Sequence, residues 1–254
     1  MPCSRGGNIS IKALSILYQD RHLVAVNKPS GLLVHRSMID RHETENAMRI
    51  LRDQLGQWVY PLHRLDKPTS GVLIFALDRE TARLMTQSFS DGQAFKYYLA
   101  IVRGVTKELE CIDYPLKDLW DKMTDQKATR DKPEKASVTQ YRRLATVELP
   151  HPVGRYCTAR YSLIEATPLT GRNRQIRRHM KHIFHPVVGD TTYGDGRQNA
   201  FFRKNFNCCR LLLHAKGIEF IHPYSEQRIS IKAPLDQTFG SLLEALHWDK
   251  VGLS

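Results

Sequence analysis

Long apolar segments are absent from this chain of 254 residues. No uninterrupted apolar run approaches the roughly 20 residues that a membrane-spanning helix requires. The N-terminal stretch MPCSRGGNISIKALS also lacks the apolar core of a secretory signal peptide, and we expect residues 1–14 to form a flexible leader. These absences predict a soluble, cytoplasmic protein with no membrane partner.

Paired cysteines and metal-ligand spacings are scarce as well. The five cysteines are odd in number and contain no C-x-x-C pair, which argues against a disulfide framework and a structural zinc site. We therefore expect free thiols in a reducing compartment. His179, His182 and His185 are spaced by three residues, whereas zinc proteases place two histidines four residues apart on one helix face. The sequence thus predicts no bound metal, and we expect these imidazoles to contact phosphate or solvent.

Acidic residues are outnumbered along the whole chain. Lys and Arg total 38 against 26 Asp and Glu, which gives a formal net charge of +12. Such an excess favours a polyanionic partner, with nucleic acid ahead of an anionic membrane surface.

Strand-like and helix-like segments alternate irregularly. β-branched and aromatic residues predict strands in segments such as SILYQD, HLVAVNK, FKYYLAIVRG and RISIKAP. Apolar residues at helical spacing and terminal signals predict helices at about residues 43–56, 79–92, 172–184 and 235–248. Residues 117–135 are dense in mixed charge, so we expect an exposed, mobile connection there. This order is typical of an α+β domain with a mostly antiparallel sheet.

The segment HRLDKPTSG, residues 63–71, places charged side chains between two apolar segments. A turn requires only the Pro, Ser and Gly that the segment also contains, so Arg64 and Asp66 need another explanation. Either the two charges form a surface ion pair, which contributes little to stability, or Asp66 is a nucleophile or general base that an arginine keeps ionised. A kinase catalytic loop reads H-R-D, but here Leu65 separates Arg64 from Asp66 and no G-x-G-x-x-G loop is present. The kinase hypothesis is therefore rejected.

Acids are missing altogether from residues 170–182, TGRNRQIRRHMKH. The segment instead carries five cations, Arg172, Arg174, Arg177, Arg178 and Lys181. A helix buried along one stripe is predicted by four apolar residues at three- and four-residue spacing, Ile176, Met180, Ile183 and Phe184. Exposed helices normally intersperse acids, so contact with phosphate explains the cations better than a solvated face. One of the arginines could instead turn inward to meet Asp66.

Six motifs in the same order resemble the RluA-type family of pseudouridine synthases. They are VNKPSG, HRLD followed by TSG, KYYLAIVRG, TGRNRQIRRH, HPVVGDTTYG and LLLHA. Each motif alone is weak evidence, but their order from residue 15 to the C-terminal helix makes the resemblance specific. It implies an α+β fold in which a mixed, mainly antiparallel sheet with flanking helices is split by a central catalytic cleft. It also implies that residues 15–254 form a single catalytic domain, because the short leader leaves no room for the N-terminal S4-type RNA-binding domain of many members.

The resemblance further implies a reaction without a cofactor, in which the N-glycosidic bond of a uridine is cleaved, the base turns, and ribose C1′ is rejoined to uracil C5. Asp66 would be the catalytic aspartate and Arg177 would pair with it. Tyr98 would stack on the base and assist removal of the C5 proton. Arg64 would fill the space that the flipped nucleotide leaves. The expected apolar neighbours of the base are Leu65, Ile176 and Leu213. The expected phosphate contacts are Arg172, Arg174 and Arg178.

The length and several segments of this chain resemble one group within the family and imply a substrate. The compact length and the segments VNKPSGLLVHRS, RLATVELP and GDGRQN most resemble members that modify uridine 65 of tRNA, which we expect to be bound by a monomer. Family members commonly have His where this chain has Arg174, so we expect an altered substrate contact with activity retained. Ribosomal RNA is an alternative substrate, because the catalytic motifs are shared.

Two other functions fit less well. A non-catalytic RNA-binding module would predict loss of Asp66 or Arg177, and both are present. A glycoside hydrolase would need a second carboxylate, which the motifs do not provide.

Overall fold

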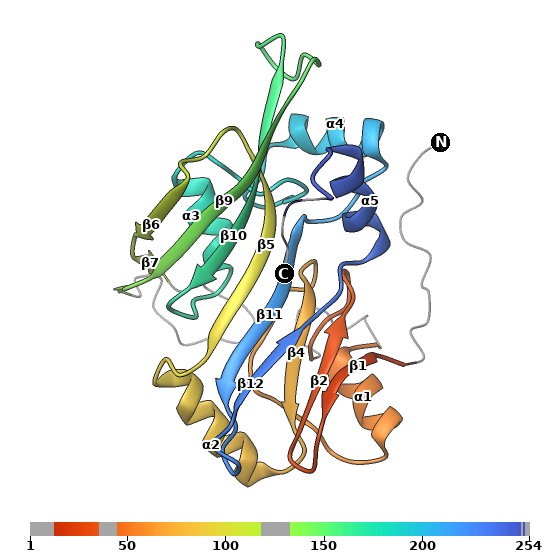
Figure 1. The fold of residues 1–254 in the computed structure, drawn as a ribbon, viewed down its shortest axis with the longest axis vertical. Helices are drawn as coiled ribbons and strands as arrows, with labels where there is room; N and C mark the ends of the chain where they lie inside the picture. Colours follow the sequence, from red (N-terminus) through yellow and green to blue (C-terminus); the bar gives the residue numbers. More distant parts are fainter. Residues whose placement is uncertain (1–12, 36–44, 118–132, 250, 252–254) are drawn as a thin grey trace.

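A ten-stranded sheet forms the centre of the computed structural model, which describes residues 13–35, 45–117, 133–249 and 251 (Figure 1). The strands of this sheet are β1 (Ser15–Gln19), β2 (Leu23–Lys28), β3 (Tyr60–Pro61), β4 (Ser70–Ala76), β5 (Phe95–Arg103), β6 (Leu109–Asp113), β9 (Val138–Leu149), β10 (Ala159–Pro168), β11 (Leu213–Ile221) and β12 (Arg228–Lys232). Two short strands, β7 (Leu116–Lys117) and β8 (Glu134–Lys135), pair with each other. The helices within the described residues are α1 (Ala47–Leu55), α2 (Arg79–Ser90), α3 (Gln175–His182), α4 (Gly196–Phe206) and α5 (Gln237–Ala245).

The strand order is β1-β2-β4-β11-β5-β10-β9-β6, with β3 paired to β4 and β12 to β11. Across the described part of the chain, every strand pairing is antiparallel apart from that of β4 with β11. The prediction of an α+β fold with a mixed, mainly antiparallel sheet is therefore confirmed. The parallel pairing comprises only two residue pairs, Ser70 with His214 and Gly71 with Ala215, and it joins the two halves of the sheet.

Side chains alternate between the two faces of the sheet, because successive residues of a strand point in opposite directions. On one face, which we call the cleft face, Leu73 and Phe75 of β4 pack with α1, and Ala100 and Val102 of β5 pack with α3. Tyr98 packs against both of these clusters, so it lies between α1 and α3. The opposite face, which we call the reverse face, packs against α2 at one end and against α4 and α5 at the other.

Capping explains where the predicted helices begin and end. At the start of α1, Asn46 accepts a hydrogen bond from the backbone N of Arg49, and the helix stops at Gly56 with a left-handed φ of 67°. Asp78 caps α2 through the backbone N of Thr81. Both helices therefore lie where the sequence predicts them.

Two helices differ from the prediction. Helix α3 covers only Gln175–His182, not residues 172–184, because Arg174 takes a left-handed φ of 54° directly before it. Helix α4 was not predicted, because its segment GRQNAFFRKNF contains Gly and Asn residues of low helix propensity. Asp195 caps this helix, and Phe202 buries it in the cluster on the reverse face.

Several expectations fall partly outside the described residues. Residues 1–12 of the expected leader and residues 118–132 of the expected mobile connection are not described. The single-domain boundary at residues 15–254 therefore stays a prediction. Within the described ranges, no helix is both long and apolar enough to cross a membrane. Cys111, Cys157 and Cys208 are free thiols, as expected. The expectation is wrong for Cys209, which is disulfide-bonded.

Candidate active site

A cavity of about 560 Å³ opens on the cleft face, between the segment that precedes α1 and the N-terminal end of α3. Tyr98 of β5 and Leu213 of β11 line the cavity on the side of the sheet, where these two strands are adjacent. The remaining walls come from Lys96 and from residues 33–35, 63–69, 168 and 170–177. Motifs that are far apart in the sequence thus meet around one space.

The HRLDKPTSG loop is held by the turn that follows β2. The side chain of Lys28 is fully buried, and its Nζ donates a hydrogen bond to the carbonyl of Lys67 at 3.1 Å. The backbone N of Gly31 donates to the same carbonyl at 2.9 Å. The hydroxyl of Ser30 donates to the carbonyl of Pro68 at 2.7 Å. These contacts fix the backbone immediately after Asp66.

Asp66 is paired with an arginine on α3, the helix that packs against the other half of the sheet. Nη1 of Arg177 donates to Oδ2 of Asp66 at 2.7 Å. The same guanidinium binds Asp190 with two parallel hydrogen bonds, from Nε to Oδ2 at 2.7 Å and from Nη2 to Oδ1 at 2.8 Å. Asp190 also accepts from the backbone N atoms of Thr192 and Tyr193. Asp190 therefore fixes the orientation of Arg177, and Arg177 fixes that of Asp66.

Electrostatics keep this arginine charged. Burial alone would lower the pKa of Arg177, but its hydrogen bonds to Asp190 and Asp66 outweigh burial and raise the pKa above the ordinary arginine value. The hydrogen bonds from Arg177 and from two backbone N–H groups outweigh the effect of burial on Asp190 and lower its pKa. The pair is thus fully ionised inside the protein, where charges persist only with such partners.

Tyr98 lies in the same cavity as Asp66. Burial, and in second place the negative charge of Asp66, raise the pKa of Tyr98 well above the ordinary tyrosine value. The phenol is therefore neutral near pH 7. A neutral phenol is a weak proton acceptor. Its ring nevertheless offers a flat apolar surface against which a nucleobase can stack.

Most of the predicted site residues line the cavity. The structure brings nine of the ten together there, namely Arg64, Leu65, Asp66, Tyr98, Arg172, Arg174, Ile176, Arg177 and Leu213. Leu65, Ile176 and Leu213 are buried apolar side chains. Arg64 and Arg174 are exposed at the rim, where they can reach a ligand. Arg178 is not part of the lining, so its predicted phosphate contact lies outside this cavity.

Two expectations for α3 and its neighbours, on His179 and Phe184, are wrong. His179 is fully buried, and its ring nitrogens lie 2.9 Å from Oγ1 of Thr139 and 3.0 Å from the carbonyl of Tyr114, so it is a core residue. His185 is half-buried and its Nδ1 lies 2.7 Å from the carbonyl of Arg103, so its expected contact with phosphate or solvent stays a prediction. Phe184 does not join the buried stripe, because the chain turns away after the helix and leaves it 86% exposed.

Sequence reasoning missed Asp190 and Lys28 as parts of the site. Asp190 belongs to the motif HPVVGDTTYG, and Lys28 to VNKPSG. The available signal in both cases was a charged residue two positions after a short apolar stretch, which ends at Val188 and at Val26. Their partners lie 13 and 39 residues away in sequence, and only the fold brings them together.

Comparison with known proteins identifies the family of the chain. A family model described as RNA pseudouridylate synthase matches residues 22–182, which include Asp66, Tyr98 and Arg177. The chain belongs to the RNA pseudouridylate synthase family. Two curated relatives are both named tRNA pseudouridine synthase C. The protein of Pasteurella multocida is 53% identical over 236 residues, covering 93% of this chain and 97% of its own. That of Vibrio cholerae is 52% identical over 237 residues, covering 93% and 97%.

A solved pseudouridylate synthase shares the fold. The structure of human RNA Pseudouridylate Synthase Domain Containing 4 aligns with a TM-score of 0.68 and 27% sequence identity, covering 92% of this chain and 93% of that chain. The resemblance drawn from the motifs is thereby confirmed for family and fold.

Proposed function

We propose that the protein converts uridine to pseudouridine in tRNA, with Asp66 as the catalytic carboxylate. The observation that carries this proposal is the position of Asp66 in a basic, aromatic cavity, bound to an arginine that a second buried carboxylate holds in place. The relatives named tRNA pseudouridine synthase C support tRNA as the substrate.

The cavity suits a nucleotide that has left its stack. Flipping a base out of a helix requires a few kcal/mol, which contacts inside the protein must offset. Tyr98 offers a stacking surface for the uracil, and Ile176 and Leu213 offer apolar walls. At the rim, Arg64 takes the space that the flipped nucleotide vacates, and Arg172 and Arg174 bind the neighbouring phosphates.

The reaction is an isomerisation, so the nucleotide keeps all its heavy atoms and exchanges one proton with the solvent. The bond between C1′ and N1 breaks, the uracil turns, C1′ bonds to C5, the C5 proton is lost and N1 gains a proton. Asp66 acts on the ribose, either by attack on C1′ or by removal of a ribose proton, and both routes need its carboxylate at the same place. Arg177 holds that carboxylate, and the neutral Tyr98 contributes chiefly by stacking.

We assign uridine 65 as the target, on the motif resemblance to tRNA-modifying members of the family. A tRNA transcript with cytidine at position 65 should then be bound and left unmodified. Pseudouridine at another position would contradict this assignment while leaving the reaction in place.

Tritium release from tRNA carrying C5-labelled uracil tests the reaction. The native protein should release tritium, and Asp66→Asn should lower the rate by at least about 100-fold while retaining tRNA binding. Asp53→Asn is a matched control, because Asp53 is an exposed carboxylate on α1 that pairs with Arg52. Release from ribosomal RNA but not from tRNA would contradict the proposed substrate. Release from neither RNA would contradict the proposed activity.

A further inference from the structure

The loop that carries Asp66 enters the sheet where β4 pairs with β11, a pairing of only two residue pairs. Ser70, the first residue of β4, follows Asp66 by four residues and pairs with His214 of β11. The next residue, Gly71, lies so close to β11 that a Cβ atom there would be 2.2 Å from the carbonyl oxygen of Ala215. Any shift of β4 against β11 at this point therefore moves the loop that carries Asp66.

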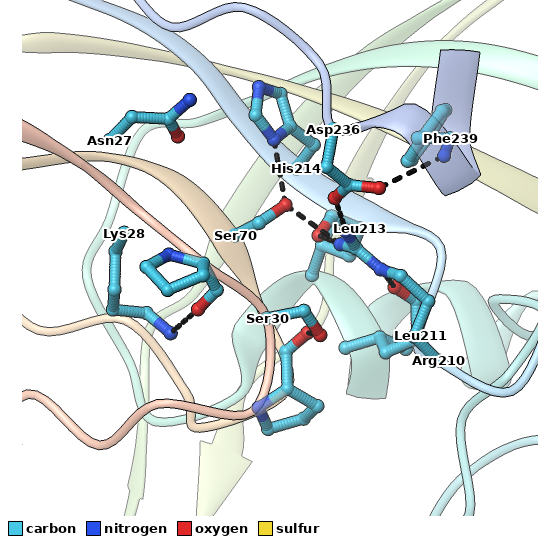
Figure 2. A network of polar contacts seen from close by, with 12 residues as sticks. Asn27, Lys28, Ser30, Ser70, Arg210, Leu211, Leu213, His214, Asp236 and Phe239 are labelled. Carbon is cyan, nitrogen blue, oxygen red and sulfur yellow. Dashed lines mark hydrogen bonds and ion pairs between the residues drawn. The ribbon is translucent and has the colours of Figure 1, made fainter. Parts of the chain in front are cut away.

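A buried polar network holds this connection from the reverse face (Figure 2). Ser70 and His214 are almost fully buried, and Oγ of Ser70 lies 2.7 Å from Nδ1 of His214. Nη2 of Arg210 donates to the same hydroxyl at 2.7 Å. The imidazole of His214 faces Phe239 of α5, at 6.3 Å between ring centroids. The network thus lies behind the cavity, on the side that α5 covers.

Arg210 links this network to the start of α5. Its guanidinium forms an ion pair with Asp236, which caps the helix by accepting a hydrogen bond from the backbone N of Phe239 at 3.0 Å. Nε of Arg210 donates to the carbonyl of Leu211 at 3.0 Å. The side chain of Arg210 is only 12% exposed. One guanidinium therefore contacts α5, the segment before β11 and the first residue of β4.

The partners of the network fix where its protons lie. Nε2 of His214 lies 3.2 Å from the carbonyl of Ala233, which can only accept, so Nε2 carries the proton. Nδ1 is then an acceptor, and the hydroxyl of Ser70 donates to it. That hydroxyl accepts in turn from Arg210. The network has one hydrogen-bonding arrangement, and such a fully paired buried network defines one geometry.

We propose that Arg210, Ser70 and His214 are positioning residues that hold Asp66 in its reactive place from the opposite face of the sheet, an inference that rests on the proposed function. The backbone connects the two sites, since the N–H of Thr69, next to Ser70, donates to the carbonyl of Asp66 at 3.0 Å. Arg177 orients the carboxylate from the cleft face, and the network fixes its backbone from the reverse face. An error of about 1 Å in the place of a reacting group can lower a rate about 100-fold.

Single-turnover kinetics at saturating enzyme would test the proposal on Ser70→Ala and Arg210→Met. Both variants should lower the rate of pseudouridine formation by about 10- to 100-fold, with the Kd for tRNA unchanged within about threefold. His214→Asn keeps an acceptor near the place of Nδ1, so it should retain more of the rate than Ser70→Ala. Leu242→Ala is the matched control: it shortens a buried apolar residue of α5, lowers the Tm and should leave the rate unchanged. All measurements are made well below the lowest Tm of the set.

Amide hydrogen exchange gives a readout that does not depend on the reaction. Peptides that cover residues 63–71 should exchange faster in Ser70→Ala and Arg210→Met than in the native protein, and Leu242→Ala should leave them unchanged. Equal exchange in all proteins, or a rate that falls as much in Leu242→Ala, would overturn the positioning role. If the native protein modifies no RNA, the proposed function fails and the exchange comparison alone decides whether the network holds the loop.

Discussion

Arg177 touches two carboxylates, but only Asp66 lines the cavity. Asp190 is the more buried partner, and its side chain has no exposed surface. Asp190 binds Nε and Nη2 of Arg177, so that Nη1 is the guanidinium nitrogen directed at Asp66. The orientation of Asp66, the proposed catalytic carboxylate, therefore depends on a residue that is not part of the lining.

Asp190→Asn should reveal this dependence. Breaking a buried pair by neutralising one partner costs about 3–5 kcal/mol in other proteins, so we expect a loss of about 3 kcal/mol of unfolding free energy. The rate of tritium release should fall at least about tenfold at unchanged tRNA affinity, because Arg177 becomes free to turn. Urea unfolding and single-turnover assays would measure both. Asp195→Asn is the control, since its ion pair with Arg103 is partly exposed and should cost less than about 1 kcal/mol.

Phe184 is strained and exposed at the same time. It follows the last turn of α3 with a left-handed φ of 63°, where glycine is normally found, and its side chain is 86% exposed. Phe184→Gly should therefore raise the free energy of unfolding by about 1 kcal/mol, whereas Phe184→Ala should not, because alanine keeps the strain. Urea titrations of both variants would measure this. A loss of stability in the glycine variant would show that the ring makes a contact that stabilises the fold.

At the scale of elements, sequence patterns predicted the helices whose ends are determined by interactions between residues close in the chain. Helices α1 and α2 were found because apolar spacing and capping residues coincide at Asn46, Gly56 and Asp78. Helix α4 was missed because its stability comes from the packing of Phe202 against Tyr161, two residues that are distant in the chain. The same reason applies to the site. Asp66 and its arginine follow from motifs, whereas Asp190 and the network of Arg210 follow from tertiary contacts alone.

The contact between β4 and β11 should tolerate no side chain at position 71. Gly71 has a φ of 114°, and a Cβ atom there would clash with the backbone of Ala215. Gly71→Ala should lower the free energy of unfolding by about 3 kcal/mol or more, since backbone strain and steric overlap add. Gly31→Ala is the matched control, because Gly31 has a φ of 88° but open space around it, and strain alone should cost about 1 kcal/mol. Equal losses in the two variants would mean that the strands can separate at this connection.

At the scale of the whole molecule, the net charge of +12 predicts salt-dependent RNA binding. Arg174 stands exposed at the rim of the cavity, so Arg174→Gln should reduce the slope of log Kd against log salt by about 1. Filter binding of tRNA between 50 and 200 mM salt (about the range in which phosphate contacts dominate) would measure the slope. Arg83→Gln on α2 is the control, because Arg83 is paired with Glu80 and α2 covers the reverse face. A slope that changes equally in both variants would show that charge acts without a defined contact at the rim.

Stability should also depend on pH through the network behind the site. Burial, and in smaller part the charge of Arg210, lower the pKa of His214 to about 4, although its hydrogen bond with the carbonyl of Ala233 opposes this shift. Below about pH 6.5 the unfolded chain takes up a proton at this histidine and the folded protein does not, so stability is lost as the pH falls from about 6.5 toward 4. The full loss is about 3 kcal/mol. Urea titrations at several pH values should show a shallower slope in this window for His214→Asn than for the native protein. An unchanged slope would mean that His214 takes up its proton without breaking its bond to Ser70, and the single hydrogen-bonding arrangement of the network would then be wrong.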